Sequence, residues 1–492
     1  MDLYTLLRLS KIPFTDKIVN HEVSQICDNS QEVVKDGVFI AIKGENRDGH
    51  DYILDVIKKG IKTIIYEDHY YDYINIEQVN FIKVHDTKKT FALISACFYQ
   101  HPSKQMNVIG VTGTNGKTTT STLIYNLYRL LQEKCTLIGT NGIYIGQNLK
   151  PNINTTPSAK SIQSILHESL TSGIKNVVME VSSHARKQQR VSQLDFNTII
   201  FTNFSQDHLD YHKTFEDYFY SKALILSSLG NYLSDKRVIL NGDDKYYKRF
   251  LTFSNVENYT YGLGSHNDFQ AREINCAVDN IYFHFYGFNK FLGVCNTNNL
   301  FGFFNVYNLL AVLSYFYLEN YEISKVLEVI PKLQGVKGRM EKVISSSSLN
   351  VFIDYAHTPD SVFRVLKEIK MLACRRVICI IGCGGNRDPL KRPIMGKITT
   401  DLADLVIFTA DNPRDEEVSD IITEMIKGTE KNNYLVIENR EEAIQYAIRI
   451  MNDRDIVVIL GKGHENYQIV KSEKKTFSDY EVAQKYLEIY KR

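Results

Sequence analysis

Short runs of apolar, β-branched residues recur along the chain, and each is followed by a stretch with the spacing of a helix. Three such runs, at 38–42 (VFIAI), 63–66 (TIIY) and 81–84 (FIKV), predict strands in the first hundred residues. Strands that alternate with helices indicate α/β architecture. The polar residues His101-Pro102-Ser103 precede a new strand, so we expect a domain boundary near Gln105.

A second region opens with a predicted strand at 107–113 (NVIGVTG), followed by a turn and a helix in which leucine and isoleucine recur at helical spacing from 123 to 131. Further strands are predicted at 176–181 (NVVMEV) and 197–203 (NTIIFTN). A third region begins near Gly335 and holds four strand-like runs, VFIDYAHTPD, VICIIGCGGNRD, LVIFTADNPRDE and IVVILGKGHENY. Three domains are therefore expected, at 1–105, 106–335 and 336–492.

Each of the four runs in the third region stops in glycine, aspartate, asparagine, arginine or histidine. In open parallel sheets, ligands bind at the carboxyl ends of the strands. The four polar strand ends therefore predict one site lined by all of them.

Composition and charge argue against several classes of protein function. The 492 residues suffice for two to four domains, and 58 Lys plus Arg balance 57 Asp plus Glu, which argues against nucleic-acid binding by bulk charge. The eight cysteines form no C-x-x-C pair and read as reduced thiols. The first residues lack the apolar core of a secretory signal, so we expect a cytoplasmic protein with no membrane partner.

One uncharged stretch, 291–318, could be considered as a membrane span. It contains five asparagines whose amides would need partners in hydrocarbon. We therefore predict a buried helix of a soluble core there.

Several motifs carry candidate chemistry. Residues 113–119 (GTNGKTT) lie between a strand and a helix, where backbone N–H groups can approach a triphosphate, although Val111 replaces the first glycine of the strict P-loop pattern. Glu180 ends an apolar strand and could bind a metal. His208 and His212 are four residues apart, which suits a zinc site, helix capping or a plain surface position.

Taken together and in order, these motifs identify a family. GTNGKTT, EVSSH, DHLDYH, GFFNVYN, GRME, DYAHTPD, GCGGNRD, DNPR and GKGHENYQ resemble those of the Mur ligases of peptidoglycan synthesis, most closely the branch that forms the UDP-linked tripeptide. The resemblance implies an α/β protein of three domains: a small N-terminal domain that binds the uridine nucleotide, a central P-loop-type ATPase domain with a mostly parallel sheet, and a C-terminal Rossmann-like domain that brings the amino acid.

The resemblance also implies the reaction. ATP would phosphorylate the terminal carboxylate of a UDP-N-acetylmuramoyl dipeptide, and the amine of meso-diaminopimelate would attack the acyl phosphate. Mg²⁺ would assist, held by Thr118, Glu180, His208 and Lys222. Lys222 aligns with a lysine that the family carries as a carbamate. A carbamate suits a position near a metal, because an unmodified ammonium ~4 Å from a divalent ion would be repelled by roughly 8 kcal/mol at an effective dielectric of 20.

The remaining site residues follow from the same resemblance. Catalysis is assigned to Lys117, Glu180, His208 and Lys222, and ATP binding to Gly113, Thr114, Asn115, Gly116, Lys117, Thr118, Thr119, Asn305, Arg339 and Asp354. The UDP-dipeptide would contact Ser30, Glu45, Asn46, Arg47, Asn154, Thr155, Thr156, Ser182, Gln188 and Arg190. Two departures stand out: Asn29-Ser30-Gln31 replaces the usual Asp-Ser-Arg, and Ala185 replaces a common glycine. Asp354 could instead cap the following helix.

Selection of the amino acid would rest on Arg387, Asp411, Asn412, Pro413, Arg414, Gly461 and Glu465. A guanidinium pairs bidentately with a carboxylate and Glu465 can accept from an ammonium, so the set suits a zwitterionic end. Arg414 therefore favours meso-diaminopimelate over L-lysine, unless it is only a surface residue at a helix start. A lysine-adding ligase, folylpolyglutamate synthase and a P-loop NTPase without ligase activity are the alternatives. We expect a monomer.

Overall fold

The computed structural model describes residues 1–44, 47–67, 76–152, 154–205, 209–230, 235–278, 280–346, 349–373 and 375–490. Its contacts group the chain into two compact units. The first comprises 1–117, 132–240 and 244–259, and the second comprises 118–131, 241–243 and 260–492. The predicted domain boundaries at 105/106 and 335/336 stay predictions.

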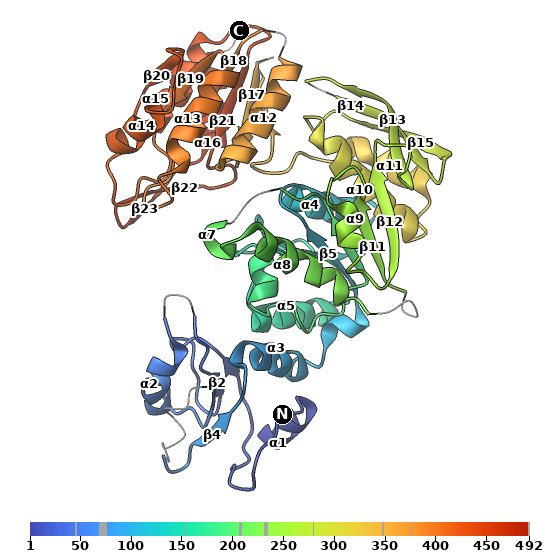
Figure 1. The fold of residues 1–492 in the computed structure, drawn as a ribbon, viewed down its shortest axis with the longest axis vertical. Helices are drawn as coiled ribbons and strands as arrows, with labels where there is room; N and C mark the ends of the chain where they lie inside the picture. The colour runs from blue at the N-terminus through green and yellow to red at the C-terminus, as the bar shows by residue number, and fades with distance from the viewer. Residues whose placement is uncertain are drawn as a thin grey trace. The chain divides into compact units, whose positions relative to one another are not determined.

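The first unit begins with a small parallel sheet in the order β1-β2-β3-β4, formed by β1 (Ile26–Cys27), β2 (Val38–Ile40), β3 (Thr63–Tyr66) and β4 (Asn80–Lys83). These are the three predicted strands and one more. Helices α1 (Leu3–Leu9) and α3 (Thr87–Phe98) pack on one face, and α2 (Ile53–Lys58) packs on the other (Figure 1).

The rest of the first unit is built around β5 (Asn107–Thr112), which pairs in parallel with β9 (Asn176–Glu180) and β10 (Thr198–Phe201). Strands β11 (Arg237–Asn241) and β6 (Cys135–Gly139) extend this sheet in parallel. Beyond β6, β7 (Gly142–Ile145) pairs antiparallel with β6, and β8 (Asn148–Lys150) pairs antiparallel with β7. The shorter elements and helices are η1 (Gly49–Tyr52), η3 (Pro102–Gln105), α5 (Ala159–Thr171), α6 (Ser183–Lys187), α7 (Leu209–His212), α8 (Phe215–Ser227) and α9 (Tyr247–Leu251).

In the second unit, α4 (Lys117–Leu130) lies against α10 (Phe304–Leu318), and the hydroxyls of Tyr128 and Tyr315 are 2.6 Å apart. Strands β13 (Phe269–Cys276), β14 (Ile281–Gly287) and β15 (Lys290–Thr297) form antiparallel hairpins, and β12 (Glu257–Gly262) crosses the unit boundary. Helix α11 (Ile323–Val329) and η4 (Ile330–Lys332) follow.

The prediction of one buried helix at 291–318 is wrong in its first half. Residues up to Thr297 form β15, and only Phe304 onward is helical. The amides nevertheless find internal partners, as the argument required: Asn305 donates to the carbonyl of Phe301 and Asn308 donates to Asn305. Among the described helices, none has both the length and the apolar character needed to cross a membrane.

The third predicted region forms a sheet in the order β16-β17-β21-β18-β19-β20. Strands β17 (Asn350–Asp354), β18 (Val377–Ile381), β19 (Leu405–Phe408) and β21 (Ile456–Leu460) are the four predicted runs, and they are parallel. The flanking strands are β16 (Glu341–Lys342), β20 (Tyr434–Val436), and the separate hairpin of β22 (Tyr467–Val470) and β23 (Glu473–Thr476).

Helices cover both faces of this sheet because alternate strand residues point to opposite sides (Figure 1). Helices α12 (Pro359–Leu372), α13 (Lys391–Leu402) and α14 (Val418–Ile426) bury one set, and α15 (Arg440–Ile450) and α16 (Asp479–Ile489) bury the other. The result is a three-layer α/β/α domain with the carboxyl ends of its central strands at one edge.

Candidate active site

The turn between β5 and α4, which the sequence predicts to be a phosphate loop, requires glycine at two of its positions. Gly113 and Gly116 have φ values of +146° and +84°, which favour glycine. A Cβ on Gly113 would lie 1.9 Å from the Thr202 hydroxyl, so glycine is also required by space. Asn115 is anchored through its backbone N–H, which donates to the side chain of Asn203.

Two lysines converge on this turn. The Lys117 ammonium donates to the carbonyls of Gly113 and Thr114 at 2.9 and 2.8 Å, and the Lys222 ammonium donates to the same Gly113 oxygen at 2.7 Å. Lys222 is only 2% exposed and lies over the ring of Tyr218. Lys222 is therefore not a solvated surface lysine.

Glu180 ends β9 in a buried position, 1% exposed. Its carboxylate accepts hydrogen bonds from the backbone N–H and the hydroxyl of Thr140, at 2.7 and 3.2 Å. Oxygen donors of this kind suit Mg²⁺. His208 lies outside the described residues, and the described residues contain no group of three or more histidine, cysteine or acidic side chains placed to hold a metal.

His212, the other member of the predicted histidine pair, is fully buried. Its Nε2 lies 2.9 Å from the Ser183 hydroxyl and its Nδ1 lies 3.2 Å from the Ser221 hydroxyl. The surface interpretation of His212 is therefore wrong. Helix α7 begins at Leu209 and contains His212 but not His208.

Four of the predicted UDP-dipeptide residues form one hydrogen-bonded cluster. Arg190 donates to Gln188 and to the carbonyl of Thr156, and the Thr156 hydroxyl donates to Ser182 and to the carbonyl of Glu180. Thr155 contacts Thr140, while Asn154 is exposed beside the cluster.

The N-terminal residues that the sequence assigns to the nucleotide are less connected. The Ser30 carbonyl accepts from Lys59, and the Arg47 carbonyl accepts from Gly44 while its side chain is exposed. Glu45 and Asn46 lie outside the described residues. Their roles stay predictions.

In the second unit, Arg339 donates to the hydroxyl of Thr118, at the start of α4, at 3.3 Å. Thr118 and the following Thr119 are both buried. Asn305 is also buried, and its side chain bonds to Phe301 and Asn308, within and just before α10.

Asp354 does not cap the next helix. Its carboxylate accepts from the backbone N–H groups of Met340 and Ala356, both at 2.8 Å, and Thr358 caps α12 instead. Burial raises the pKa of Asp354, although Arg339 and the two backbone N–H groups act in the opposite direction.

The amino-acid residues assigned from the sequence gather at the carboxyl edge of the C-terminal sheet. Asn412 donates to Glu465 at 2.9 Å, and Gly461 has φ +111° at a position where a Cβ would lie 2.5 Å from the Asp411 carboxylate. Arg414 is partly buried, donates to the carbonyl of Gly385 at 2.7 Å, and pairs through its backbone with Ile469. It lies before α14, so the helix-start interpretation is wrong.

Arg387 is exposed and near the same turn, since a Cβ on Gly384 would lie 3.6 Å from its Cγ and 3.0 Å from an Arg414 nitrogen. Pro413 completes the turn and packs its carbonyl against Gly385. The predicted set therefore occupies one edge of one sheet.

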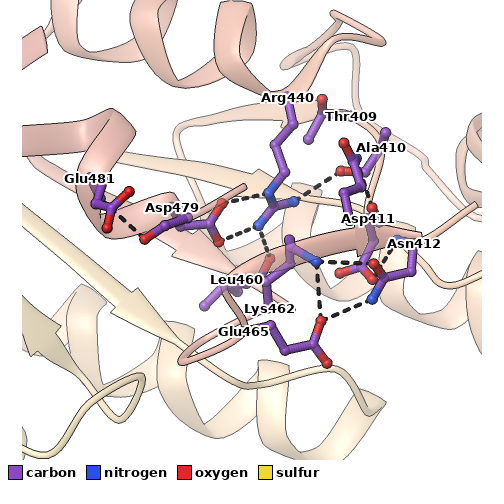
Figure 2. Close-up of polar contacts among 12 residues, drawn as sticks. Thr409, Ala410, Asp411, Asn412, Arg440, Leu460, Lys462, Glu465, Asp479 and Glu481 are labelled. Carbon is purple, nitrogen blue, oxygen red and sulfur yellow. Dashed lines mark hydrogen bonds and ion pairs between the residues drawn. The ribbon is translucent and has the colours of Figure 1, made fainter. Parts of the chain in front are cut away.

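The sequence did not identify Lys462. Its ammonium is fully buried and donates to Asn412 and Glu465, both at 3.1 Å (Figure 2). Lys462 lies inside the GKGHENYQ motif, so the motif could have pointed to it. Lysine is usually solvated, however, and only the burial of Lys462 indicates that it belongs to the site.

Comparison with known proteins decides the family. Models of the Mur ligase family catalytic domain, the Mur ligase middle domain and the Mur ligase glutamate ligase domain match residues 22–99, 111–315 and 338–463. The UDP-N-acetylmuramoyl-L-alanyl-D-glutamate--2,6-diaminopimelate ligase of Bacillus cereus is 38% identical to this chain, over 98% of each chain. The ligase of the same name from Clostridioides difficile is 39% identical, over 94% of this chain and 95% of its own. The chain belongs to the Mur ligase family.

Solved structures agree with this assignment. A UDP-N-acetylmuramoyl-L-alanyl-D-glutamate--2,6-diaminopimelate ligase aligns with a TM-score of 0.69 at 28% identity over 98% of each chain. The MurF ligase of Thermotoga maritima, in complex with ADP, aligns at 0.64 with 16% identity over 96% of this chain and 98% of its own. This Mur ligase is thus an ATP-dependent acid–amino-acid ligase of the α/β three-domain fold.

Proposed function

We propose that this Mur ligase adds meso-diaminopimelate to UDP-N-acetylmuramoyl-L-alanyl-D-glutamate, forming the UDP-linked tripeptide of peptidoglycan synthesis. The observation that carries the proposal is the edge of the C-terminal sheet, where Arg414 lies over the Gly384–Gly385 turn and Glu465 lies beside Asn412. A guanidinium and a carboxylate so placed suit the distal carboxylate and ammonium of a diamino diacid. The relatives named above carry the same activity in their names.

The reaction would proceed in two steps. The γ-phosphoryl group of ATP passes to the terminal carboxylate of the dipeptide, releasing ADP. The neutral amine of the incoming amino acid then attacks the acyl carbon, and inorganic phosphate leaves as the amide bond forms and the amine loses its proton.

This chain's residues have distinct tasks in those steps. Lys117 and the backbone N–H groups of the turn at 113–119 would neutralise charge on the transferring phosphoryl group. The cluster of Arg190, Gln188 and Thr156 would hold the dipeptide.

The buried Glu180 carboxylate is the kind of oxygen donor that suits Mg²⁺, and the family resemblance would add Thr118, His208 and a carbamylated Lys222 as ligands. When bound, it would supply charge neutralisation on the phosphate oxygens. Lys222 could serve as a ligand only after carbamylation, because an ammonium has no lone pair to donate.

The convergence of two ammonium groups on one oxygen supports the carbamate. Lys117 and Lys222 both donate to the carbonyl of Gly113, so two like charges lie close together beside a buried turn. A carbamate on Lys222 converts this repulsion into attraction.

L-Lysine is the competing amino acid, and Arg414 argues against it because lysine has no distal carboxylate to pair with a partly buried guanidinium. Folylpolyglutamate synthase from Mycobacterium tuberculosis shares the fold, with a TM-score of 0.60 at 15% identity over 75% of this chain. We also propose that the enzyme works in the cytoplasm, where ATP and UDP-linked substrates are found.

Phosphate release tests the reaction. A ligase should release phosphate from ATP only when both the UDP-dipeptide and an amino acid are present. Steady release with ATP alone would instead indicate an NTPase without ligase activity.

Specificity tests the amino acid. Loss of a charge-assisted pair costs roughly 2–4 kcal/mol, so wild-type enzyme should prefer meso-diaminopimelate over L-lysine by a factor of about 30 to 1,000 in kcat/KM. Arg414→Ala should lose most of that preference, whereas Arg364→Ala, on the exposed face of α12, should keep it. Equal use of lysine by wild type would contradict the proposal.

A further inference from the structure

A buried ion pair contacts the strand ends that lead into the proposed amino-acid site. Arg440 and Asp479 are both fully buried, and two guanidinium nitrogens donate to the two carboxylate oxygens at 2.7 Å each (Figure 2). The guanidinium also donates to two backbone carbonyls: Nη1 donates to that of Ala410 at 3.1 Å, and Nη2 donates to that of Leu460 at 3.0 Å. One guanidinium therefore satisfies a carboxylate and two strand-end carbonyls.

These contacts join four elements. Arg440 is the first residue of α15 and Asp479 is the first residue of α16. Leu460 ends β21 and Ala410 follows β19, and these two strands are not neighbours because β18 lies between them. No backbone hydrogen bond of the sheet ladder can tie β19 directly to β21, so Arg440 supplies a connection that the sheet itself cannot.

The two carbonyls belong to the residues immediately before the site. Ala410 precedes Asp411 and Asn412, and Leu460 precedes Gly461 and Lys462. Lys462 then donates to both Asn412 and Glu465, so the backbone that Arg440 holds leads directly into the hydrogen-bonded site residues.

We propose that Arg440, oriented by Asp479, is a positioning residue for the amino-acid substrate. It fixes the separation between the end of β19, which carries the Asp411–Arg414 turn, and the end of β21, which carries Gly461 and Glu465. This inference rests on the proposed function, because it takes these residues to be the amino-acid site.

The cost of burial supports a role beyond holding the fold. Taking an arginine and an aspartate out of water carries a desolvation penalty that the attraction within the pair only partly repays, and well-packed apolar residues often stabilise a fold as well or better. Because this fully buried pair also binds two carbonyls next to the site, we take its main role to be fixing the positions of the two strand ends.

The same sheet offers a matched control. Arg376 pairs with the buried Asp455 through a nitrogen 2.7 Å from the carboxylate, and it also donates to the carbonyl of Ile450. This second pair lies where β18 and β21 begin, at the opposite edge from the site. Both pairs join an arginine to a buried aspartate in one domain, but only the first contacts the strand ends that carry the site.

The test compares Arg440→Lys with Arg376→Lys in the full chain. Lysine keeps the charge but cannot reach Asp479 and both carbonyls at once. KM for meso-diaminopimelate should rise by about tenfold to a hundredfold in Arg440→Lys, since displacements near 1 Å have effects of that size. KM for ATP and for the UDP-dipeptide should change by less than about twofold, and Arg376→Lys should leave all three KM values near wild type.

A second variant guards against misfolding. Arg440→Met combined with Asp479→Leu removes both charges together, and it should fold while showing the same selective rise in KM for the amino acid. Equal increases in all three KM values, an unchanged KM for meso-diaminopimelate in a folded variant, or failure of both Arg440 variants to fold would each overturn the positioning role. Wild-type enzyme that does not use meso-diaminopimelate would instead overturn the proposed function, so the two failures are distinguishable.

Discussion

At the scale of single residues, the most informative side chains are charged groups that the fold removes from water. Lys222, Lys462, Arg440 and Asp479 are all at most 2% exposed. Lys222 could be proposed as a functional residue from the sequence because the chain resembles a known family. Arg440 and Asp479 could not, because a charged residue in the first turn of a helix usually faces solvent, and only the packed structure reveals the carbonyls they reach.

Lys222→Ala should nearly abolish ligation, because the proposed carbamate would be lost as a metal ligand. Added bicarbonate or short carboxylates should partly restore activity in this variant. Lys150→Ala removes a lysine of a surface ion pair with Glu168 and is the matched control, with activity near wild type. Ligation assays on the two variants are the measurement, and full activity of Lys222→Ala with both substrates present would reject the carbamate assignment.

His464 should make stability depend on pH. Burial, and to a smaller extent Arg339, lowers the pKa of His464 from 6.5 to about 4. Between these values the unfolded chain binds more protons than the folded one, so the free energy of unfolding falls as pH drops, by at most about 1.4 kcal/mol per pH unit.

Denaturant unfolding of wild type and His464→Gln between pH 4 and pH 7 measures this slope. The substitution should flatten the curve, whereas replacing the half-exposed His266 by glutamine should not. An identical slope in wild type and His464→Gln would show that His464 is not the group responsible.

At the scale of elements, hydrophobic patterning placed the strands well because they are buried. All four predicted runs of the third region became parallel strands at nearly the expected residues. The stretch 291–318 was misread because an uncharged run does not distinguish an antiparallel strand from a helix by composition alone. Gly293 lies in β15 with a φ of +144°. A glycine in an uncharged run did not by itself indicate a strand.

The turn after β5 gives a prediction about backbone conformation. Gly113→Ala should destabilise the protein by more than about 2 kcal/mol and weaken ATP binding, because alanine meets both an unfavourable φ and the Thr202 hydroxyl. Gly173→Ala is the matched control: it also has positive φ, +73°, but has no atom within 4 Å of the added Cβ. It should cost only about 1 kcal/mol. Thermal unfolding and nucleotide titration of both variants test whether the steric contact with Thr202 adds to the cost of an unfavourable φ.

At the scale of the whole molecule, the order and spacing of the motifs were enough to predict the family and the α/β architecture. The motifs predict the dipeptide residues in the central domain and the amino-acid residues in the C-terminal domain, but they could not show that residues 118–131 group with the second compact unit. Thr156 and Arg190 belong to the first unit, whereas Arg414 and Glu465 belong to the second. Motif order identifies the parts, but the grouping of those parts depends on tertiary packing.

That division leads to a prediction about domain movement. Amide formation needs the amine nitrogen within about 3–3.5 Å of the acyl carbon, so substrates held by residues of the two units must meet during each turnover. The ATP analogue and the UDP-dipeptide together should therefore lower the radius of gyration measured by small-angle scattering, as expected for substrate-driven closure. Lys117→Ala, which should lose affinity for the nucleotide phosphates, is the control and should show a smaller change at the same ligand concentrations. An unchanged radius of gyration in wild type at saturation would count against closure, and would require that the two substrates already meet without it.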